Sequence, residues 1–346
     1  MSRALVISGG GSKGAFAIGV VKRLLNEYVN LDFDIFVGTS TGSLIVPLVA
    51  MQEMALLEKL YTTQKTQNIV LQNRLGDRLG DHSIFDATPL WNLLTANYTD
   101  ERYEQLLLTG KKLYLTTTCL QTGELVVFTT DDAPEAPEHY TLTSMTDANH
   151  FRKAVMASSC QPVFMPPIKV NKDVPGEANP GYQFVDGGVR EYAGIQMAID
   201  AGATEIFIIL LSPDTKTIDD KEYKDLFSLL QRTIDIFTDD VGKNDLIVPN
   251  QYNAALEYID AVKKKMKRSG LTSDQINEFF KIRGRENPYE DKLPIRIFTF
   301  RPEAPLGGGP GGLTFDPTEM KAMIKKGEGS ASDFIASLNP ADITWA

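Results

Sequence analysis

Short apolar runs, each followed by a glycine-containing turn and a helical pattern, organise the first fifty residues. The runs cover residues 4–8 and 33–37, and their length and continuity are typical of strands buried in a parallel sheet. The helical patterns follow at residues 15–28 and 44–51. Two successive strand–turn–helix units predict an α/β protein in which helices cover a mostly parallel sheet.

The remaining residues add further elements to this frame. Residues 52–109 carry mixed helical and loop signals, and residues 131–139 read as an acidic, proline-containing loop. We predict strands at residues 113–118, 125–129, 184–186, 206–211 and 293–301, and helices at residues 151–160, 221–240, 250–268 and 315–326. No internal repeat or long linker divides the chain. We therefore expect one domain over residues 1–346, with a core in about 1–215 and an extension over about 216–346.

The turn after the second strand has the sequence Gly38-Thr39-Ser40-Thr41-Gly42, which fits the G-x-S-x-G pattern of a nucleophile elbow. A serine at the tip of such a turn needs small neighbours, because its backbone is held in a sparsely allowed conformation. The two glycines let strand and helix pack closely, and the helix N-terminus places free N–H groups beside the serine oxygen. Ser40 is therefore a candidate nucleophile, and a simple helix cap is the alternative.

The glycine-rich turn after the first strand allows two functions. Gly9, Gly11 and Gly14 satisfy the dinucleotide-binding pattern G-x-G-x-x-G, and Asp32 or Asp34 lies about where a ribose-binding acid is expected. Two features count against this function. The acid precedes the second strand instead of ending it, and that strand already ends in the G-x-S-x-G turn.

The same loop can instead form an oxyanion hole, because consecutive glycines let backbone N–H groups turn toward one point. In a parallel sheet this loop and the Ser40 turn would both lie at the carboxyl ends of neighbouring strands. One turn would then hold a nucleophile and the other would receive the developing negative charge. Lys13 precedes the last glycine of the loop, which excludes a Walker-type phosphate loop.

Asp186 is a candidate general base for Ser40, since it ends a short apolar run and is followed by Gly187 and Gly188. An Asp-Gly turn is common, so a purely structural turn is the alternative. The serine–acid–histidine order of α/β-hydrolases is excluded, because no histidine follows Asp186. Surface or capping positions explain the three histidines better, namely His82, His139 and His150. We therefore prefer a direct Ser40–Asp186 dyad, in which a partly desolvated aspartate accepts the serine proton.

The composition is that of a globular protein, with 42% hydrophobic and 23% charged residues among 346. A net charge of −10 argues against general nucleic-acid binding. Cys119 and Cys160 are the only cysteines, and we expect no disulfide framework, metal or cofactor. We expect no signal peptide before the first strand, and no apolar run approaches the ~20 residues of a membrane span. We expect a cytoplasmic protein. The sequence leaves two points open, namely peripheral contact with membranes and the oligomeric state.

The motifs together resemble the patatin-like phospholipases, also called patatin-like acyl hydrolases. The resemblance rests on four blocks in order: Gly9 to Gly14, Gly38 to Gly42, Ala157-Ser158-Ser159 with the prolines that follow, and Asp186-Gly187-Gly188. It covers residues 1 to about 215 and is weak beyond. The family implies a three-layer α/β/α sandwich with a mostly parallel sheet, and a Ser–Asp dyad without histidine.

Carried over to this chain, the resemblance implies that Ser40 is the nucleophile and Asp186 the base. The N–H groups of Gly10 and Gly11, with that of Thr41, would form the oxyanion hole. The residues that support these motifs are Gly9, Lys13, Gly14, Gly38, Gly42, Gly187 and Gly188.

The chain departs from the family pattern at two of these motifs. Lys13 stands where the family usually has arginine, which keeps the charge but loses the planar fork. Tyr192-Ala193 replaces a frequent Asn-Pro, a change that we expect in the wall of the pocket and outside the dyad.

We therefore expect a serine acyl hydrolase that cleaves fatty-acyl esters of phospholipid, lysophospholipid or glyceride, with a lipid or membrane interface as its partner. The alternatives are a nucleotide-binding oxidoreductase that uses the Gly9–Gly11–Gly14 loop, and a binding module that has lost its activity. The basic run Lys263 to Arg268 ends the helix predicted at 250–268, and we favour a docked helix with a solvated end over a patch that binds anionic lipid. Residues 305–312, rich in glycine and proline, predict a flexible loop.

Overall fold

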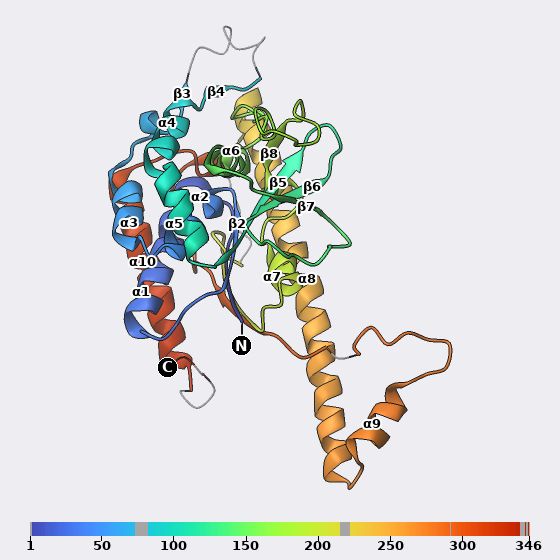
Figure 1. Ribbon diagram of the computed structural model, residues 1–346. Helices are drawn as coiled ribbons and strands as arrows, with labels where there is room; N and C mark the ends of the chain where they lie inside the picture. The colour runs from blue at the N-terminus through green and yellow to red at the C-terminus, as the bar shows by residue number, and fades with distance from the viewer. Residues whose placement is uncertain are drawn as a thin grey trace.

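The computed structural model describes residues 2–72, 82–214, 222–290 and 292–339, together with residues 343 and 345 (Figure 1). Within these residues the strands form one eight-stranded sheet and a separate two-stranded ribbon. The sheet has the order β10-β9-β1-β2-β5-β6-β7, with β8 also paired to β5, and its strands are β1(Arg3–Ile7), β2(Ile35–Thr39), β5(Lys112–Cys119), β6(Leu125–Thr129), β7(Thr141–Ser144), β8(Phe184–Asp186), β9(Glu205–Ile209) and β10(Arg296–Phe300). The ribbon pairs β3(Leu71–Gln72) with β4(Phe85–Asp86).

The strands β10, β9, β1, β2 and β5 are mutually parallel, while β6 and β8 run antiparallel to β5. Side chains alternate between the two faces, because successive residues of a strand point in opposite directions. On β1, Leu5 and Ile7 belong to one buried cluster, and Ala4 and Val6 belong to another on the opposite face. The parallel core of the sheet is therefore buried on both sides.

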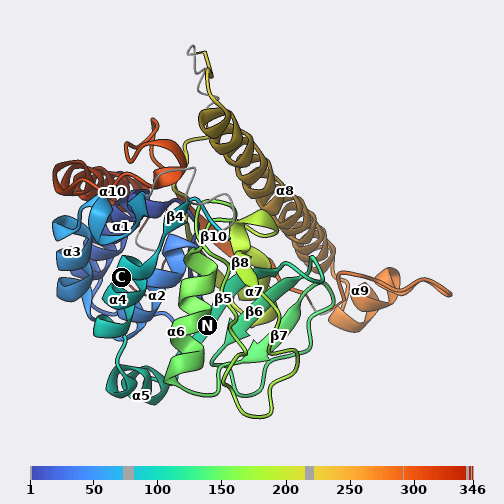
Figure 2. The same ribbon diagram turned by 90° about the horizontal axis from the view of Figure 1, so that it is seen from above.

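Helices cover both faces of the sheet (Figures 1 and 2). One face packs against the larger cluster, from α1(Gly14–Glu27), α2(Thr41–Ala50), α3(Met54–Thr63), α4(Thr88–Asn97), α5(Asp100–Leu108), α6(Ala148–Ser159) and α10(Pro317–Ser337). The other face is covered by α7(Ile195–Asp200) and the adjoining part of α8(Leu226–Arg268). The result is an α/β/α arrangement around a mostly parallel sheet, and the fold class predicted from the sequence is confirmed.

The C-terminal helix α10 packs directly on α1. A Cβ atom built on Gly19 would lie 2.0 Å from the carbonyl oxygen of Ile324, and one built on Gly327 would lie 2.0 Å from that of Phe16. The two backbones therefore approach more closely than any larger residue would allow. Through this contact the end of the chain becomes part of the first core layer.

The structure differs from the sequence prediction most clearly in α8. The two helices predicted at 221–240 and 250–268 are one helix of 43 residues, which continues through Pro249. Gly242 lies inside this helix, where the absence of a side chain makes room for Tyr192. A Cβ on Gly242 would lie 2.6 Å from the ring of Tyr192. The C-terminal half of α8 extends away from the body and leads into α9(Ser273–Phe280), as Figure 1 shows.

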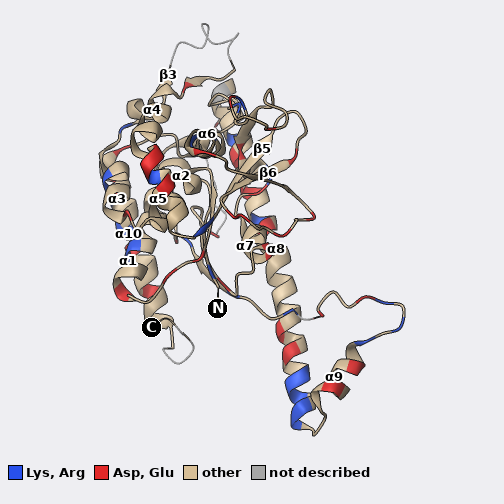
Figure 3. Ribbon diagram, in the orientation of Figure 1, with Lys and Arg blue, Asp and Glu red and all other residues tan. Residues whose placement is uncertain are grey.

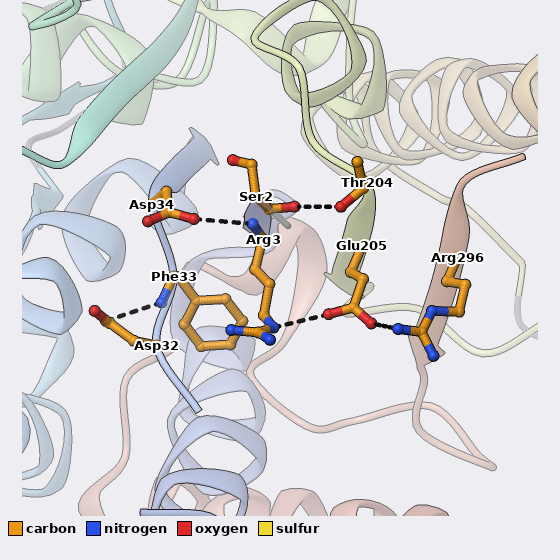
Figure 4. Close-up of polar contacts among 8 residues, drawn as sticks. All are labelled: Ser2, Arg3, Asp32, Phe33, Asp34, Thr204, Glu205 and Arg296. Atoms are coloured by element: carbon orange, nitrogen blue, oxygen red, sulfur yellow. Dashed lines mark hydrogen bonds and ion pairs between the residues drawn. The ribbon is translucent and has the colours of Figure 1, made fainter. Parts of the chain in front are cut away.

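A buried carboxylate ties the amino ends of three neighbouring strands together (Figure 4). Glu205 at the start of β9 is 1% exposed, and its Oε2 lies 2.7 Å from Nε of Arg3 on β1. Its other oxygen pairs with the guanidinium of Arg296 on β10. One buried acid thus pairs with two arginines, and its removal takes this buried counter-charge from both.

We predict that Glu205→Ala lowers the free energy of unfolding by about 3 kcal/mol, because two guanidinium groups lose the same buried carboxylate partner. Urea denaturation followed by circular dichroism measures the change. Asp214→Ala is the control, since Asp214 pairs with Arg301 at 3.0 Å but is 85% exposed. This surface pair is expected to contribute less than about 1 kcal/mol. Equal losses in the two variants would contradict the prediction.

Candidate active site

Ser40 occupies the turn between β2, which ends at Thr39, and α2, which begins at Thr41. Its φ of 56° and ψ of −122° are rare for a residue with a side chain. Glycine is required on both sides of it. A Cβ on Gly38 would lie 2.7 Å from the carbonyl carbon of Gly42, and one on Gly42 would lie 2.0 Å from the carbonyl oxygen of Ile7. The backbone is thus held in the strained form that exposes the serine side chain.

Three further serines fix the strained turn. The N–H of Ser40 donates to Oγ of Ser158 at 3.0 Å. The Ser40 carbonyl accepts from Oγ of Ser43 at 2.6 Å and from Oγ of Ser159 at 3.3 Å. Two of these serines end α6, which packs on α2. From the sequence, Ser158 and Ser159 were known only as part of a family block, whereas the structure shows that both form hydrogen bonds with the Ser40 backbone.

Strand β5 brings Asp186 to Ser40. Its edge pairs first with β2, up to Thr116 opposite Thr39, and then with β8, where Thr117 is opposite Asp186. Strands β2 and β8 thus pair with successive parts of the same edge of β5 and run toward each other. Asp186, at the end of β8, therefore lies beside the turn that holds Ser40. The Ser40 hydroxyl is close enough to hydrogen-bond the Asp186 carboxyl group, which favours the ionised form and lowers its pKa.

The Asp186 carboxyl group is held in a dry but polar setting. It is 7% exposed, and Oδ1 accepts a hydrogen bond from the N–H of Gly188 at 2.8 Å. Burial raises the pKa of Asp186 to about 6, while the Ser40 hydroxyl and the Gly188 N–H act in the opposite direction. Such a carboxylate is a stronger base than a solvated aspartate and is still ionised at neutral pH.

The first glycine loop lies against the Ser40 turn, as the sequence predicted for neighbouring parallel strands. A Cβ on Gly9 would lie 3.0 Å from Cβ of Ser40. Gly10 and Gly11 have φ values of 151° and 57°, which turn the chain sharply before α1. Among the hydrogen bonds between described residues, none uses the N–H groups of Gly10, Gly11 or Thr41 as donors. These groups are available to a ligand beside Ser40.

Lys13 at the end of this loop lines the same cavity. Burial lowers the pKa of its ammonium group, and the charge of Asp235 on α8 partly offsets that effect. The attraction between the two charges depends on charge alone and needs no planar fork, so a lysine provides it in place of the arginine usual in the family.

A second glycine loop, residues 307–312, packs on the first. A Cβ on Gly11 would lie 2.3 Å from the carbonyl oxygen of Gly312, and one on Gly312 would lie 2.1 Å from that of Gly10. At the other end of the contact, a Cβ on Gly308 would lie 2.3 Å from Oγ of Ser12. The sequence predicted only a flexible loop here. In the structure its glycines let two backbones touch, so the loop supports the candidate oxyanion hole from behind.

Tyr192 and α8 close the site on the remaining side. The Tyr192 hydroxyl donates to the carbonyl oxygen of Gly9 at 2.6 Å. Asp245 on α8 accepts from the N–H groups of Tyr192 and Ala193 at 2.7 and 2.9 Å. Burial and the nearby Asp245 charge raise the pKa of Glu191, so this neighbouring carboxyl group is held toward its protonated form. Tyr192 thus links the glycine loop to the loop that follows Asp186.

Ser40 and Asp186 open into a cavity of about 810 Å³. Its inner wall is apolar and comes from α2, α3, α4 and α10, with Leu44, Leu48, Leu57, Leu60, Leu90, Leu93, Leu94 and Met320. Charged residues of α8 form the opposite wall, namely Arg232, Asp235, Asp239, Asp240 and Lys243. The cavity therefore suits a molecule with a long apolar part and a polar end.

The three histidines take no part in this arrangement. None lines the cavity in the described parts of the chain. His82 and His139 are exposed, whereas His150 is buried against Phe128 and burial lowers its pKa. His150 also belongs to the start of α6, where its N–H donates to the capping Asp147.

The geometry also bears on the dinucleotide alternative. Asp34 accepts the N–H of Arg3, at the amino end of β1 (Figure 4), and Asp32 pairs with Lys111 just before β5. The glycine loop lies at the opposite, carboxyl end of the sheet. Neither acid can reach a ribose bound there, and the backbone of Gly312 already occupies the space beside Gly11.

A serine on a strained strand–helix turn beside a buried carboxylate is the arrangement expected of a nucleophile elbow, so Ser40 and Asp186 form a candidate active site. The family model of the patatin-like phospholipases matches residues 5–199, and the chain belongs to that family. A search of curated proteins found no match. Among solved structures, VipD from Legionella pneumophila is similar at 12% identity and a TM-score of 0.37, over 97% of this chain and 67% of that one.

The second glycine loop gives a test of its role. We predict that Gly312→Ala lowers kcat for ester hydrolysis on the order of 100-fold with little change in KM, because a methyl group there displaces the Gly10–Gly11 backbone from its place beside Ser40. Steady-state kinetics with a p-nitrophenyl ester measures both constants. Gly329→Ala on α10 is the control, since a Cβ there meets nothing within 4 Å. Unchanged kcat in a folded Gly312→Ala variant would contradict the prediction.

Proposed function

We propose that this protein is a serine acyl hydrolase that cleaves the fatty-acyl ester bonds of lipids through a Ser40–Asp186 dyad. The observation that carries the proposal is the position of the two side chains. They lie side by side where a strained turn opens into a cavity of about 810 Å³ with an apolar inner wall. Membership of the patatin-like phospholipase family supports the lipid substrate.

In the acylation step, Oγ of Ser40 attacks the ester carbonyl carbon while the Asp186 carboxylate takes the hydroxyl proton. The carbonyl oxygen becomes an oxyanion, which the N–H groups of Gly10, Gly11 and Thr41 stabilise. When this intermediate collapses, the bond from carbon to the alcohol oxygen breaks. The proton on Asp186 passes to the departing alkoxide, so the lipid alcohol leaves and the acyl group stays on Ser40.

Deacylation repeats these roles with water. Asp186 takes a proton from a water molecule, whose oxygen attacks the acyl carbon, and the same N–H groups hold the second oxyanion. The bond to Oγ of Ser40 then breaks, the proton returns to Ser40, and a fatty acid is released. A single carboxyl group serves as base and acid in both halves because its raised pKa lets it hold a proton for a short time near neutral pH.

The two walls of the cavity suggest how the substrate is oriented. The leucine-rich wall from α2, α3 and α4 would take the acyl chain, since it offers apolar contact along its length. The charged residues of α8 would face the polar end, and they carry both signs of charge. Phospholipid, lysophospholipid and glyceride esters all meet these requirements.

We predict that Ser40→Ala abolishes both ester hydrolysis and covalent labelling by a fluorophosphonate probe, because it removes the attacking oxygen. Ser212→Ala is the matched control, since Ser212 is another serine in the wall of the cavity and should keep the label. Gel fluorescence and mass spectrometry of the labelled peptide measure the outcome. A label that persists in Ser40→Ala would refute the assignment of the nucleophile.

The raised pKa of Asp186 predicts the pH dependence of the reaction. Asp186 can accept a proton only when it is ionised, so kcat/KM should fall as the pH drops through about 6. A solvated aspartate, with its reference pKa of ~3.9, would keep activity to far lower pH. Initial rates with a soluble ester between pH 4.5 and 8 measure the profile. Asp186→Asn should fold normally and lose turnover at every pH, and an acidic limb near pH 4 in the wild type would count against the dyad.

A further inference from the structure

Exposed apolar side chains surround the mouth of the cavity. Val189, Ile236 and Phe237 line the cavity and are at the same time 45%, 50% and 65% exposed. Val189 lies in the turn that follows Asp186, and α8 contacts this turn. Ile236 and Phe237 lie on the outer face of α8. Large apolar groups exposed together at the entrance of a site indicate an interaction surface.

The same face of α8 continues this apolar surface toward the start of the helix. Leu226 and Leu229 are 80% and 52% exposed, and their spacing to Ile236 and Phe237 places all four on one side of the helix. The opposite side packs on the body through Gln231 and Leu246, which are 2% and 8% exposed. One side of the helix thus docks on the protein, and the other presents apolar side chains to solvent.

The charges beside this face are mixed. Lys243 pairs with Asp239 at 2.5 Å, and Asp240 and Arg232 add one charge of each sign. A surface without net positive charge gains little from anionic lipid, so apolar insertion would supply its affinity for a bilayer. The mouth is therefore suited to a lipid surface of low charge.

The strongly basic part of α8 lies elsewhere. Residues 263–268 are at the far end of the helix, beyond the body of the protein (Figure 3). At 1.5 Å per residue they lie roughly 40 Å from Ile236 along the helix axis. Docking through that end would hold the mouth of the cavity away from the bilayer, whereas docking through the Leu226–Phe237 face would bring the two together.

We propose that the outer face of α8 from Leu226 to Phe237, together with Val189, docks the protein on a lipid surface with the mouth of the cavity toward the bilayer. The proposal rests on the proposed function, because a lipid hydrolase must take its substrate from an aggregate. An ester with one end in the leucine-lined cavity would then pass from the bilayer into the site across a continuous apolar surface.

The test measures binding apart from catalysis, in the Ser40→Ala background. The variant Leu226→Gln/Leu229→Gln changes two exposed leucines that do not line the cavity. We expect its sedimentation with phosphatidylcholine vesicles to fall about tenfold, since two leucines lose apolar burial at the interface. The control Leu107→Gln/Leu108→Gln changes an equally apolar pair on α5 that is 47% and 86% exposed, and it should bind like the parent.

Hydrolysis separates this proposal from the one on which it rests. With Ser40 restored, Leu226→Gln/Leu229→Gln should hydrolyse a short soluble ester at the parental rate and lose about tenfold of its rate on vesicles. If the parent with Ser40 does not hydrolyse the soluble ester, the proposed hydrolase function is refuted. Vesicle binding in the Ser40→Ala background would still test the docking surface.

Three results would overturn the docking surface. The first is equal binding by the two leucine variants, or no binding by the parent. The second is binding that requires anionic lipid and disappears in Lys263→Gln/Lys264→Gln/Lys265→Gln, which would assign docking to the basic end. The third is a lipid-free dimer that dissociates only in Leu226→Gln/Leu229→Gln, measured by light scattering, which would show that the face binds a second copy of the chain.

Discussion

The register of β5 is the constraint on which the site depends. One edge of this strand pairs with β2 and then with β8, while β6 occupies the other edge. Thr116 opposite Thr39 and Thr117 opposite Asp186 therefore place the ends of two distant segments next to each other. A slip of one residue in either pairing would turn the carboxyl group to the opposite face of the sheet, away from Ser40. The sheet core, buried on both faces, prevents that slip.

Glycine packing builds the rest of the site around that pair. The loops at Gly9–Gly11 and Gly307–Gly312 meet through backbone contacts that leave no room for a Cβ at Gly11 or Gly312, and a Cβ on Gly9 would lie 3.0 Å from Cβ of Ser40. The second of these loops lies outside the region matched by the family, residues 5–199, and so do α8 and α10. The last third of the chain is thus part of the cavity wall in this protein.

Burial sets the electrostatics of the site. Asp186, Glu191 and Asp245 are all withdrawn from water, and each carboxyl group consequently has a raised pKa. The consequences differ with the contacts. Asp186 faces Ser40 and the cavity, which suits a proton acceptor, whereas Asp245 accepts two backbone N–H groups and anchors α8 to the Tyr192 loop. The same desolvation would therefore favour the proposed proton acceptor at Asp186, while at Asp245 it accompanies a structural anchor.

The sequence by itself determined whatever depends on local signals. Apolar runs predicted most strands of the large sheet but not β7, glycine spacing predicted the two turns of the site, and the order of motifs predicted the family and the candidate pair Ser40 and Asp186. Local signals were insufficient for α8, which they divided into two helices although it continues through Pro249. The space beside Gly242 is taken by the ring of Tyr192, which belongs to a distant segment. Local signals also gave no sign that residues 307–312 pack on Gly10 and Gly11, since a glycine-rich stretch looks alike whether it is free or touches another backbone. Those contacts, the cavity and the apolar face at its mouth were decided only by the tertiary structure, because each is formed by segments far apart in the chain.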